Sequence, residues 1–110
     1  MNSTMLEQEV SNLPAGKDLD KKMYSAVFGY NMENLYPESL PNYSTDICAA
    51  MRLLEYLKNK PFPETQDYLN ISFVNGKWLF EFRGLKAYTS TLALGITRVA
   101  FMYGVTYKYL

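Results

Sequence analysis

The sequence contains no histidine and only one cysteine, Cys48. Without histidine, a serine–histidine–acid triad, a histidine proton relay and a histidine metal site are all excluded. No acidic cluster has the spacing of a calcium loop, and no glycine-rich nucleotide loop occurs, so neither a metal nor a cofactor is expected. A single cysteine cannot form an intrachain disulfide, which predicts a reducing compartment and a cytoplasmic location.

An excess of charge of either sign is also missing. Eleven basic and eleven acidic side chains give a formal net charge of zero, which argues against a long nucleic acid or an anionic membrane as a partner. The longest apolar stretch, residues 92–105, is interrupted by Arg98 and is too short to span a bilayer. The first nine residues contain two acids and no apolar run, so no secretory signal is expected.

The chain does contain enough apolar material for one domain. Its 110 residues, 48% of them hydrophobic, predict a single domain over residues 1–110 that needs no disulfide or metal to hold its core. We expect a short N-terminal helix in residues 1–14, a core over residues 16–105 and a tail over 106–110. The element order of helix, helix, three strands and helix predicts an α+β fold, in which helices cover a three-stranded antiparallel meander.

Cap residues and helical spacing locate the three main helices. The first should begin near Gly16, with Asp18 and Asp20 in a solvated first turn, and end at Gly29. Ser44 is the predicted N-cap of the second helix, which carries Cys48 as a core residue. The predicted apolar face of that helix consists of Ile47, Ala50, Met51, Leu54 and Leu57. The last helix should begin after residues 89–91 and stop at Gly104.

Alternating apolar residues predict the strands. Residues 68–74 and 77–83 flank Asn75-Gly76, the strongest short signal for a two-residue hairpin. A third strand follows over residues 85–88. Phe73, Trp78, Phe80 and Phe82 are expected to lie under the helices. Glu81 and Arg83 should point outward, where a cross-strand ion pair explains them better than acid–base catalysis.

The start of the last helix is the best candidate for an anion site. Thr89, Ser90 and Thr91 bring hydroxyl groups and free backbone N–H groups to a helix N-terminus without a nearby acid. Arg83 and Lys86 lie just upstream and could supply positive charge. The simpler interpretation is that these hydroxyl groups only cap the helix.

Tyrosine is unusually frequent, with ten in the chain. Tyrosines outside regular structure are candidates for contacts with a base or a partner protein. Those in loops and the tail are Tyr36, Tyr43, Tyr107 and Tyr109. Combined with the anion site, the predicted ligand-binding residues are Tyr43, Arg83, Lys86, Tyr88, Thr89, Ser90, Thr91 and Arg98.

Four segments carry a resemblance to a known family. They are residues 16–20 (GKDLD), 41–47 (PNYSTDI), 76–82 (GKWLFEF) and 92–100 in the last helix. Over residues 16–105 the chain resembles the small phage proteins described as the phage ABA sandwich domain. The resemblance implies a phage or prophage accessory protein that works in the cytoplasm of the bacterial host.

Two functional hypotheses follow. The first is a non-enzymatic phage accessory protein that binds and sequesters a small ligand, such as a nucleotide-type immune signal of the host. A homo-oligomer is expected for this function, because subunit interfaces readily form small-ligand pockets. The alternative is an interaction module that binds or inhibits a host protein through its aromatic residues.

Overall fold

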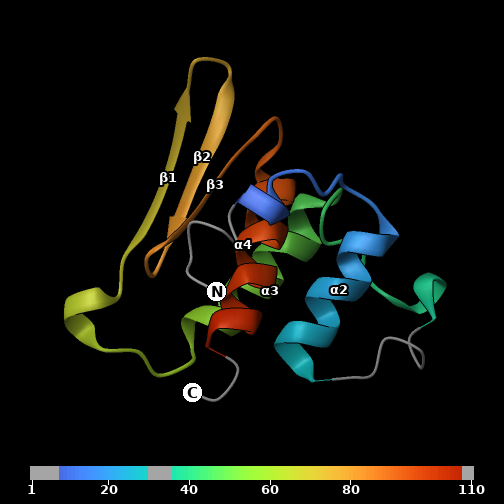
Figure 1. Cartoon of the computed structure of the whole chain (residues 1–110), viewed down its shortest axis with the longest axis horizontal. Coiled ribbons are helices and arrows are strands. Elements are labelled where there is room, and N and C mark those ends of the chain that lie inside the picture. Colours follow the sequence, from blue (N-terminus) through green and yellow to red (C-terminus); the bar gives the residue numbers. More distant parts are fainter. Residues whose placement is uncertain (1–7, 30–35, 108–110) are drawn as a thin grey trace.

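A computed structural model describes residues 8–29 and 36–107 of the chain. Helices α2 (Lys17–Phe28), α3 (Ile47–Lys58) and α4 (Leu92–Thr106) accompany a sheet of β1 (Leu69–Val74), β2 (Lys77–Phe82) and β3 (Leu85–Thr89) (Figure 1). The strands are antiparallel and lie in the order β1-β2-β3. The predicted α+β fold is therefore confirmed. The predicted N-terminal helix covers residues 1–14, and its first seven residues lie outside the described part of the chain. Residues 8–10 of this segment are helical.

Two tight turns fix the sheet. Asn75 and Gly76 have φ values of 53° and 80°, the left-handed values of a type I′ turn, as predicted. Arg83 and Gly84 repeat this geometry between β2 and β3, with φ values of 50° and 87°. In the resulting register, Phe73 lies opposite Trp78. The chain therefore reverses its direction within two residues between β1 and β2, and again between β2 and β3.

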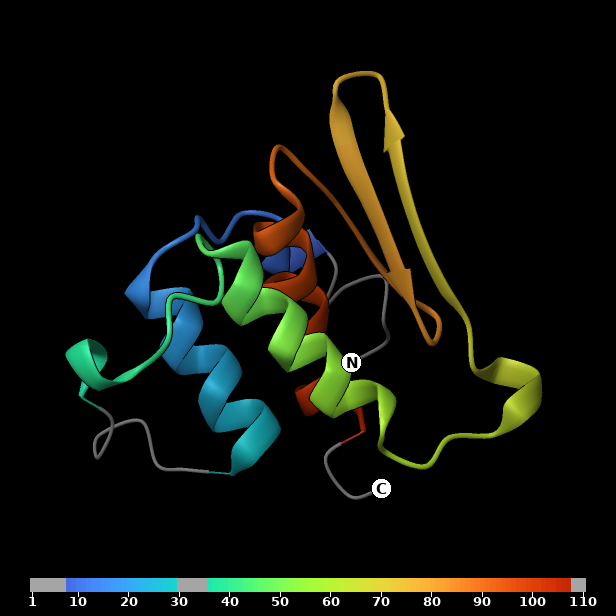
Figure 2. The same cartoon turned by 180° about the vertical axis from the view of Figure 1, so that it is seen from behind.

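Helix α4 is the centre of the core. It packs against α2, α3, β2 and β3, and it lies in the middle of the molecule in the opposite views of Figures 1 and 2. Its sequence is apolar nearly all round, which is typical of a helix with no solvated face. Phe80 and Phe82 of β2 are fully buried, as predicted. These side chains and α4 join the helical layer to one face of the sheet.

Helix α3 begins at a different residue from the one predicted. Asp46 is its N-cap, and the Asp46 carboxylate accepts a hydrogen bond of 2.9 Å from the backbone N–H of Cys48. Ser44 was predicted as the N-cap, but it is buried and bonds to residues of α2 instead. The predicted cap was wrong because a carboxylate two residues later could satisfy the same free N–H groups.

The buried face of α3 also differs from the predicted one. Ile47 and Met51, predicted to be buried, are exposed, and so is Cys48. The buried side chains of the helix are Ala49, Ala50, Leu53, Leu54 and Leu57. Both sets have helical spacing, so the apolar pattern fitted two faces and packing against α4 selected one of them.

Two further predictions are corrected. Gly104 does not end α4, which continues to Thr106; it lies in contact with Ala26 of α2 instead. Phe73 was expected under the helices, but it is 60% exposed. It belongs to β1, which none of the described helices contacts appreciably. Trp78, opposite Phe73, is half-buried.

A buried carboxylate locks α2 to the loop before α3. Asp20, expected to be solvated, is only 1% exposed. Its Oδ1 accepts a hydrogen bond of 2.9 Å from the backbone N–H of Ser44, and the Ser44 Oγ accepts one of 2.8 Å from the backbone N–H of Gly16. Burial raises the pKa of Asp20 above its ordinary value of 3.8, against the opposing effects of Ser44 and Lys17.

This raised pKa predicts how stability depends on pH. The folded state binds the Asp20 proton more tightly than the unfolded state, so the stability that Asp20 contributes is fully present below pH 3.8 and is lost as the pH rises through the folded-state pKa. The free energy of unfolding of the wild type, relative to Asp20→Asn, should therefore fall with rising pH and then level off. Urea unfolding between about pH 3 and pH 8 measures this difference. Asp18→Asn, at an exposed position in the same helical turn, is the matched control. Parallel pH profiles for wild type and Asp20→Asn would contradict the prediction.

Candidate functional site

Arg83 lies inside the protein, not on the outward face of the sheet. Its residue is 2% exposed, and every N–H of its guanidinium donates a hydrogen bond. The acceptors are the carbonyl oxygens of Leu57, Lys58 and Lys60, the hydroxyl of Tyr103 and the carboxylate of Asp67. Three of these acceptors lie at or just beyond the carboxyl end of α3, where positive charge is favourable. The predicted exposure of Arg83 is wrong, and its donors are all engaged within the protein.

Two other predicted contact residues are buried. The ring of Tyr43 packs against that of Tyr24, with 6.5 Å between centroids. Burial, followed by the neighbouring Tyr24 and Asp20, raises the pKa of Tyr43 above its ordinary value of 10. Thr89 is buried, and its Oγ1 donates a hydrogen bond of 2.6 Å to the carbonyl oxygen of Thr91. The expectation that the loop position of Tyr43 leaves it exposed is therefore wrong.

The structure brings three of the predicted residues together. Lys86, Tyr88 and Arg98 border one hollow between β3, α4 and residues 10–11, but its volume is about 30 Å³. That volume holds roughly one or two water molecules, whereas drug-sized ligands occupy pockets of about 300 Å³ or more. Arg98 donates from Nε and Nη2 to the carbonyl oxygen of Leu13, at 2.9 and 2.5 Å. Arg98 thus ties the segment before α2 to α4, and burial lowers its pKa.

The amino end of α4 is capped by its own threonine. The Thr91 side chain accepts a hydrogen bond of 3.3 Å from the backbone N–H of Leu94, and Ser90 is exposed. The two cations predicted beside this end lie elsewhere: Arg83 binds the carboxyl end of α3, and Lys86 borders the small hollow. The predicted site is therefore distributed over separate parts of the fold.

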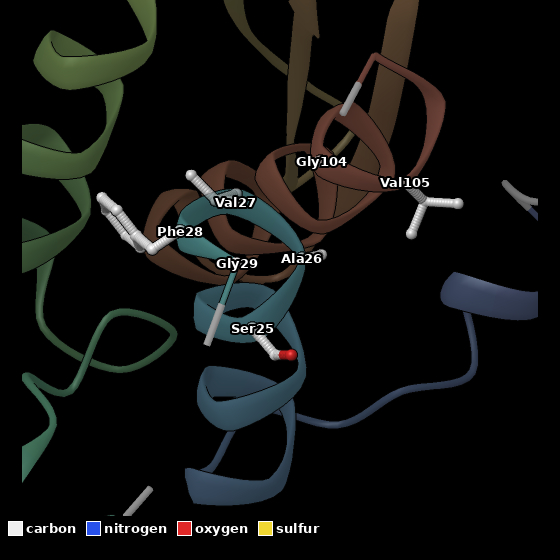
Figure 3. A pocket seen from close by; sticks show the side chains of 7 residues that line it. All are labelled: Ser25, Ala26, Val27, Phe28, Gly29, Gly104 and Val105. Atoms are coloured by element: carbon white, nitrogen blue, oxygen red, sulfur yellow. The ribbon is translucent and has the colours of Figure 1, made fainter. Parts of the chain in front are cut away.

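One hollow lies between the carboxyl ends of α2 and α4 (Figure 3). Its volume is about 500 Å³, and its walls are Ser25, Ala26, Val27, Phe28, Gly29, Gly104 and Val105. None of these side chains carries a charge. The carboxyl ends of helices carry partial negative charge, so this hollow is a poor place for a phosphate.

A second hollow, of about 360 Å³, lies at the amino end of α2. Gly16 is the N-cap there and offers no side-chain cap to the first N–H groups of the helix. Lys17 and Lys22 border the hollow, together with Asp18. The Lys17 Nζ donates a hydrogen bond of 2.6 Å to the carbonyl oxygen of Leu40. The two lysines and the uncapped N–H groups favour an anion in this hollow, whereas the Asp18 carboxylate opposes one.

An aromatic groove lies along one flank of α3. Its volume is about 130 Å³, and its walls are Phe28, Pro41, Tyr43, Ala49, Arg52, Leu53 and Tyr56. The rings of Phe28 and Tyr56 are in contact, with 4.8 Å between centroids. Arg52 is exposed and forms no ion pair with any residue in the ranges 8–29 and 36–107. We call these seven residues the α3 groove.

The α3 groove unites segments distant in the sequence. Phe28 comes from the end of α2, Pro41 and Tyr43 from the following loop, and Arg52 and Tyr56 from α3. Sequence reasoning selected only Tyr43 from this set. A signal for the four residues from α3 was present, because positions 49, 52, 53 and 56 have the spacing of one helical face.

Within the described part of the chain, no three histidine, cysteine, aspartate or glutamate residues gather to hold a metal ion. None of the described helices is long and apolar enough to cross a membrane.

Comparison with models of known protein families, with curated proteins and with solved structures finds no match. The resemblance to phage ABA sandwich domains thus stays a prediction.

Proposed function

We propose that the protein is a non-catalytic interaction module, and that the α3 groove binds one large apolar side chain of a partner polypeptide. The observation that carries this proposal is the composition of the groove. Apart from Arg52, its described lining residues are all uncharged, and three of them are aromatic. Concave sites with apolar walls and few polar groups are the usual places where ligands and anchor residues bind.

The size of the groove favours a single side chain over a nucleotide. Its volume is about 130 Å³, well below the roughly 300 Å³ at which pockets for drug-sized ligands begin. Protein interfaces commonly depend on one or two side chains that fill such a pocket and lose their water there. An aromatic or long aliphatic residue of the partner would contact Phe28, Tyr43 and Tyr56 at once.

Arg52 at the rim defines the expected neighbour of that anchor. Its guanidinium has no ion-pair partner in the described part of the chain, and a guanidinium binds a carboxylate in a bidentate manner. We expect the partner to carry an aspartate or glutamate close to the anchor residue. Because Arg52 is exposed, this contact should affect specificity and association rate more than affinity.

Selection of random peptides on the immobilised protein tests the proposal. Enriched peptides should combine an aromatic or large aliphatic residue with a nearby acid. Tyr56→Ala should weaken their binding by about tenfold or more, the effect of losing one wall of an anchor pocket. Arg52→Glu should weaken binding of the acidic peptides, and added salt should partly restore it, because salt screens the new repulsion between two carboxylates.

Met51→Ala is the matched control for Tyr56→Ala. Met51 is exposed on the same helix but does not border the groove, so peptide binding should not change. Equal losses for Met51→Ala and Tyr56→Ala, or enriched peptides without an apolar anchor, would contradict the proposal. Circular dichroism of each variant shows whether folding is retained.

A second candidate function is sequestration of a small phosphorylated ligand, such as a nucleotide. The hollow at the amino end of α2 favours it, because backbone N–H groups without a side-chain cap and two lysines meet there. Calorimetric titration with cyclic nucleotides separates the two candidates. Binding that is lost in Lys22→Ala and retained in Tyr56→Ala would favour the phosphorylated ligand.

A further inference from the structure

The strand β1 is an exposed and uncharged edge of the sheet. Among the described residues it pairs with β2 alone. Its segment exposes several large apolar side chains, namely Tyr68, Leu69, Ile71, Phe73 and Val74. No residue from 68 to 74 is charged or proline. Edge strands usually carry charges or prolines that prevent pairing with another chain, and β1 has neither.

The register shows which backbone groups of β1 are free. The carbonyl oxygen of Tyr68 accepts a hydrogen bond of 2.7 Å from the backbone N–H of Arg83. Because bonding direction alternates along a strand, residues 70, 72 and 74 also bond towards β2. The N–H and C=O groups of Leu69, Ile71 and Phe73 therefore point away from the sheet, where a further strand could bind them.

The opposite edge of the sheet is different. On β3 the same alternation directs the backbone of residues 86 and 88 outward, starting from the pair Phe82 and Leu85 beside the tight turn. Lys86 stands at one of these positions and is exposed. A lysine on a free edge is a common barrier to strand pairing, so β1 is the edge suited to association.

The sequence of β1 is complementary to itself. If two copies pair antiparallel about Ile71, Leu69 of each lies opposite Phe73 of the other, and the free N–H and C=O groups match. Asn70 of each copy then lies opposite Ser72 of the other copy. This places an amide beside a hydroxyl on the opposite face of the joined sheet. A two-fold axis usually brings like charges together, and here no charge is present to repel.

We propose that β1 pairs with β1 of a second copy of this chain, antiparallel and centred on Ile71, so that the two sheets become one. The exposed side chains of the segment amount to about 400 Å² for each chain. Strand pairing covers part of this area together with the free edge backbone, which places the interface at the small end of specific interfaces, near or below roughly 1,000 Å². Interfaces of this size are typical of weak association, so we expect a weak dimer, with Kd on the order of 10 µM or higher. This dimer does not depend on the α3 groove.

Sedimentation equilibrium of the full chain, up to about 500 µM, tests for the dimer. Ile71→Lys places two ammonium groups together at the two-fold axis and should raise Kd at least about tenfold. Tyr36→Lys also changes an exposed aromatic residue to lysine, but outside β1, and should leave Kd unchanged. A wild-type monomer at the highest concentration, or a dimer with equal Kd in both variants, overturns the proposal.

Cysteine pairing tests the register itself. In a Cys48→Ser background, Ile71→Cys brings two Cα atoms to about 5.5 Å, within the roughly 4.4–6.8 Å that a disulfide spans. Leu69→Cys is the control, because its two copies are offset by four residues, or about 13 Å. Mild oxidation should give a covalent dimer of the first variant only. Equal crosslinking of both variants, or of neither, overturns the proposed register.

Discussion

Replacing Arg83 with methionine should lower the free energy of unfolding by about 2–4 kcal/mol, because several acceptors lose a charged donor and each such loss costs about 1–3 kcal/mol where the acceptor is buried. Methionine retains an apolar stem but has no donor, so the carbonyl oxygens of Lys58 and Lys60 lose the bonds from Arg83. The carbonyl oxygen of Leu57 also loses its bond from Arg83 and keeps only backbone N–H donors, such as that of Lys60. Asp67 loses its ion pair of 3.0 Å. For a domain of about 5–15 kcal/mol total stability, this loss is a large fraction.

Lysine should not restore the stability at position 83. The guanidinium of Arg83 lies over the rings of Phe62 and Phe82, with 4.7 and 4.8 Å from Cζ to the centroids, and its planar fork reaches acceptors in several directions. An ammonium is a compact charge and cannot stack in this way. Arg83→Lys should therefore be less stable than the wild type, although more stable than Arg83→Met.

Lys86→Met is the control for the loss of a positive charge in the same hairpin. Lys86 is exposed, so this variant should stay within about 0.5 kcal/mol of the wild type. Urea unfolding followed by tryptophan fluorescence measures all three variants. If Arg83→Met loses no more stability than Lys86→Met, the structural role given to Arg83 is wrong.

Gly104→Ala should lower the free energy of unfolding by about 2–3 kcal/mol, although alanine is the better helix former by about 1 kcal/mol. A Cβ at position 104 would lie 2.6 Å from the backbone carbon of Ala26 and 2.7 Å from its carbonyl oxygen. Backbone atoms cannot rotate away as a side chain can, so α2 and α4 must move apart. Thermal unfolding should show the change as a lower Tm, by roughly 4 °C or more for each kcal/mol.

Gly95→Ala provides the comparison within the same helix. A Cβ there would meet the Thr89 Oγ1 at 2.9 Å. That hydroxyl can move only by giving up its hydrogen bond to the Thr91 carbonyl oxygen, so Gly95→Ala should lose about 1–2 kcal/mol, less than Gly104→Ala. Adding Ala26→Gly to Gly104→Ala should not restore stability, because it removes only the Ala26 Cβ. Full rescue by that second change would show that the backbone contact is not the cause.

The sequence by itself determined the features that depend on neighbouring residues. Asn75 and Gly76 form the predicted turn because both accept positive φ, and Gly29 ends α2 in the left-handed conformation, with φ of 80°. The alternation of Phe80 and Phe82 identified the strand face that is buried. The order of helices and strands followed from the same local signals.

The tertiary structure alone decided which of several locally acceptable arrangements is formed. Ser44 and Asp46 could each cap α3, and a buried carboxylate on α2 engaged the first. Gly104 could end a helix or permit close packing, and the approach of Ala26 required the second. Such choices depend on contacts between residues far apart in the chain, which local spacing does not encode.

Arg83 and the α3 groove show the same limit for the candidate site. A strand period places Arg83 outward, but it occupies a turn with φ of 50°, where its side chain reaches the end of α3. The groove needs Phe28, Tyr43 and Tyr56 from three segments that meet only after folding. The sequence therefore determined the elements, and the packing of α2, α3 and α4 decided which side chains stay at the surface, because burial is a property of the assembled core.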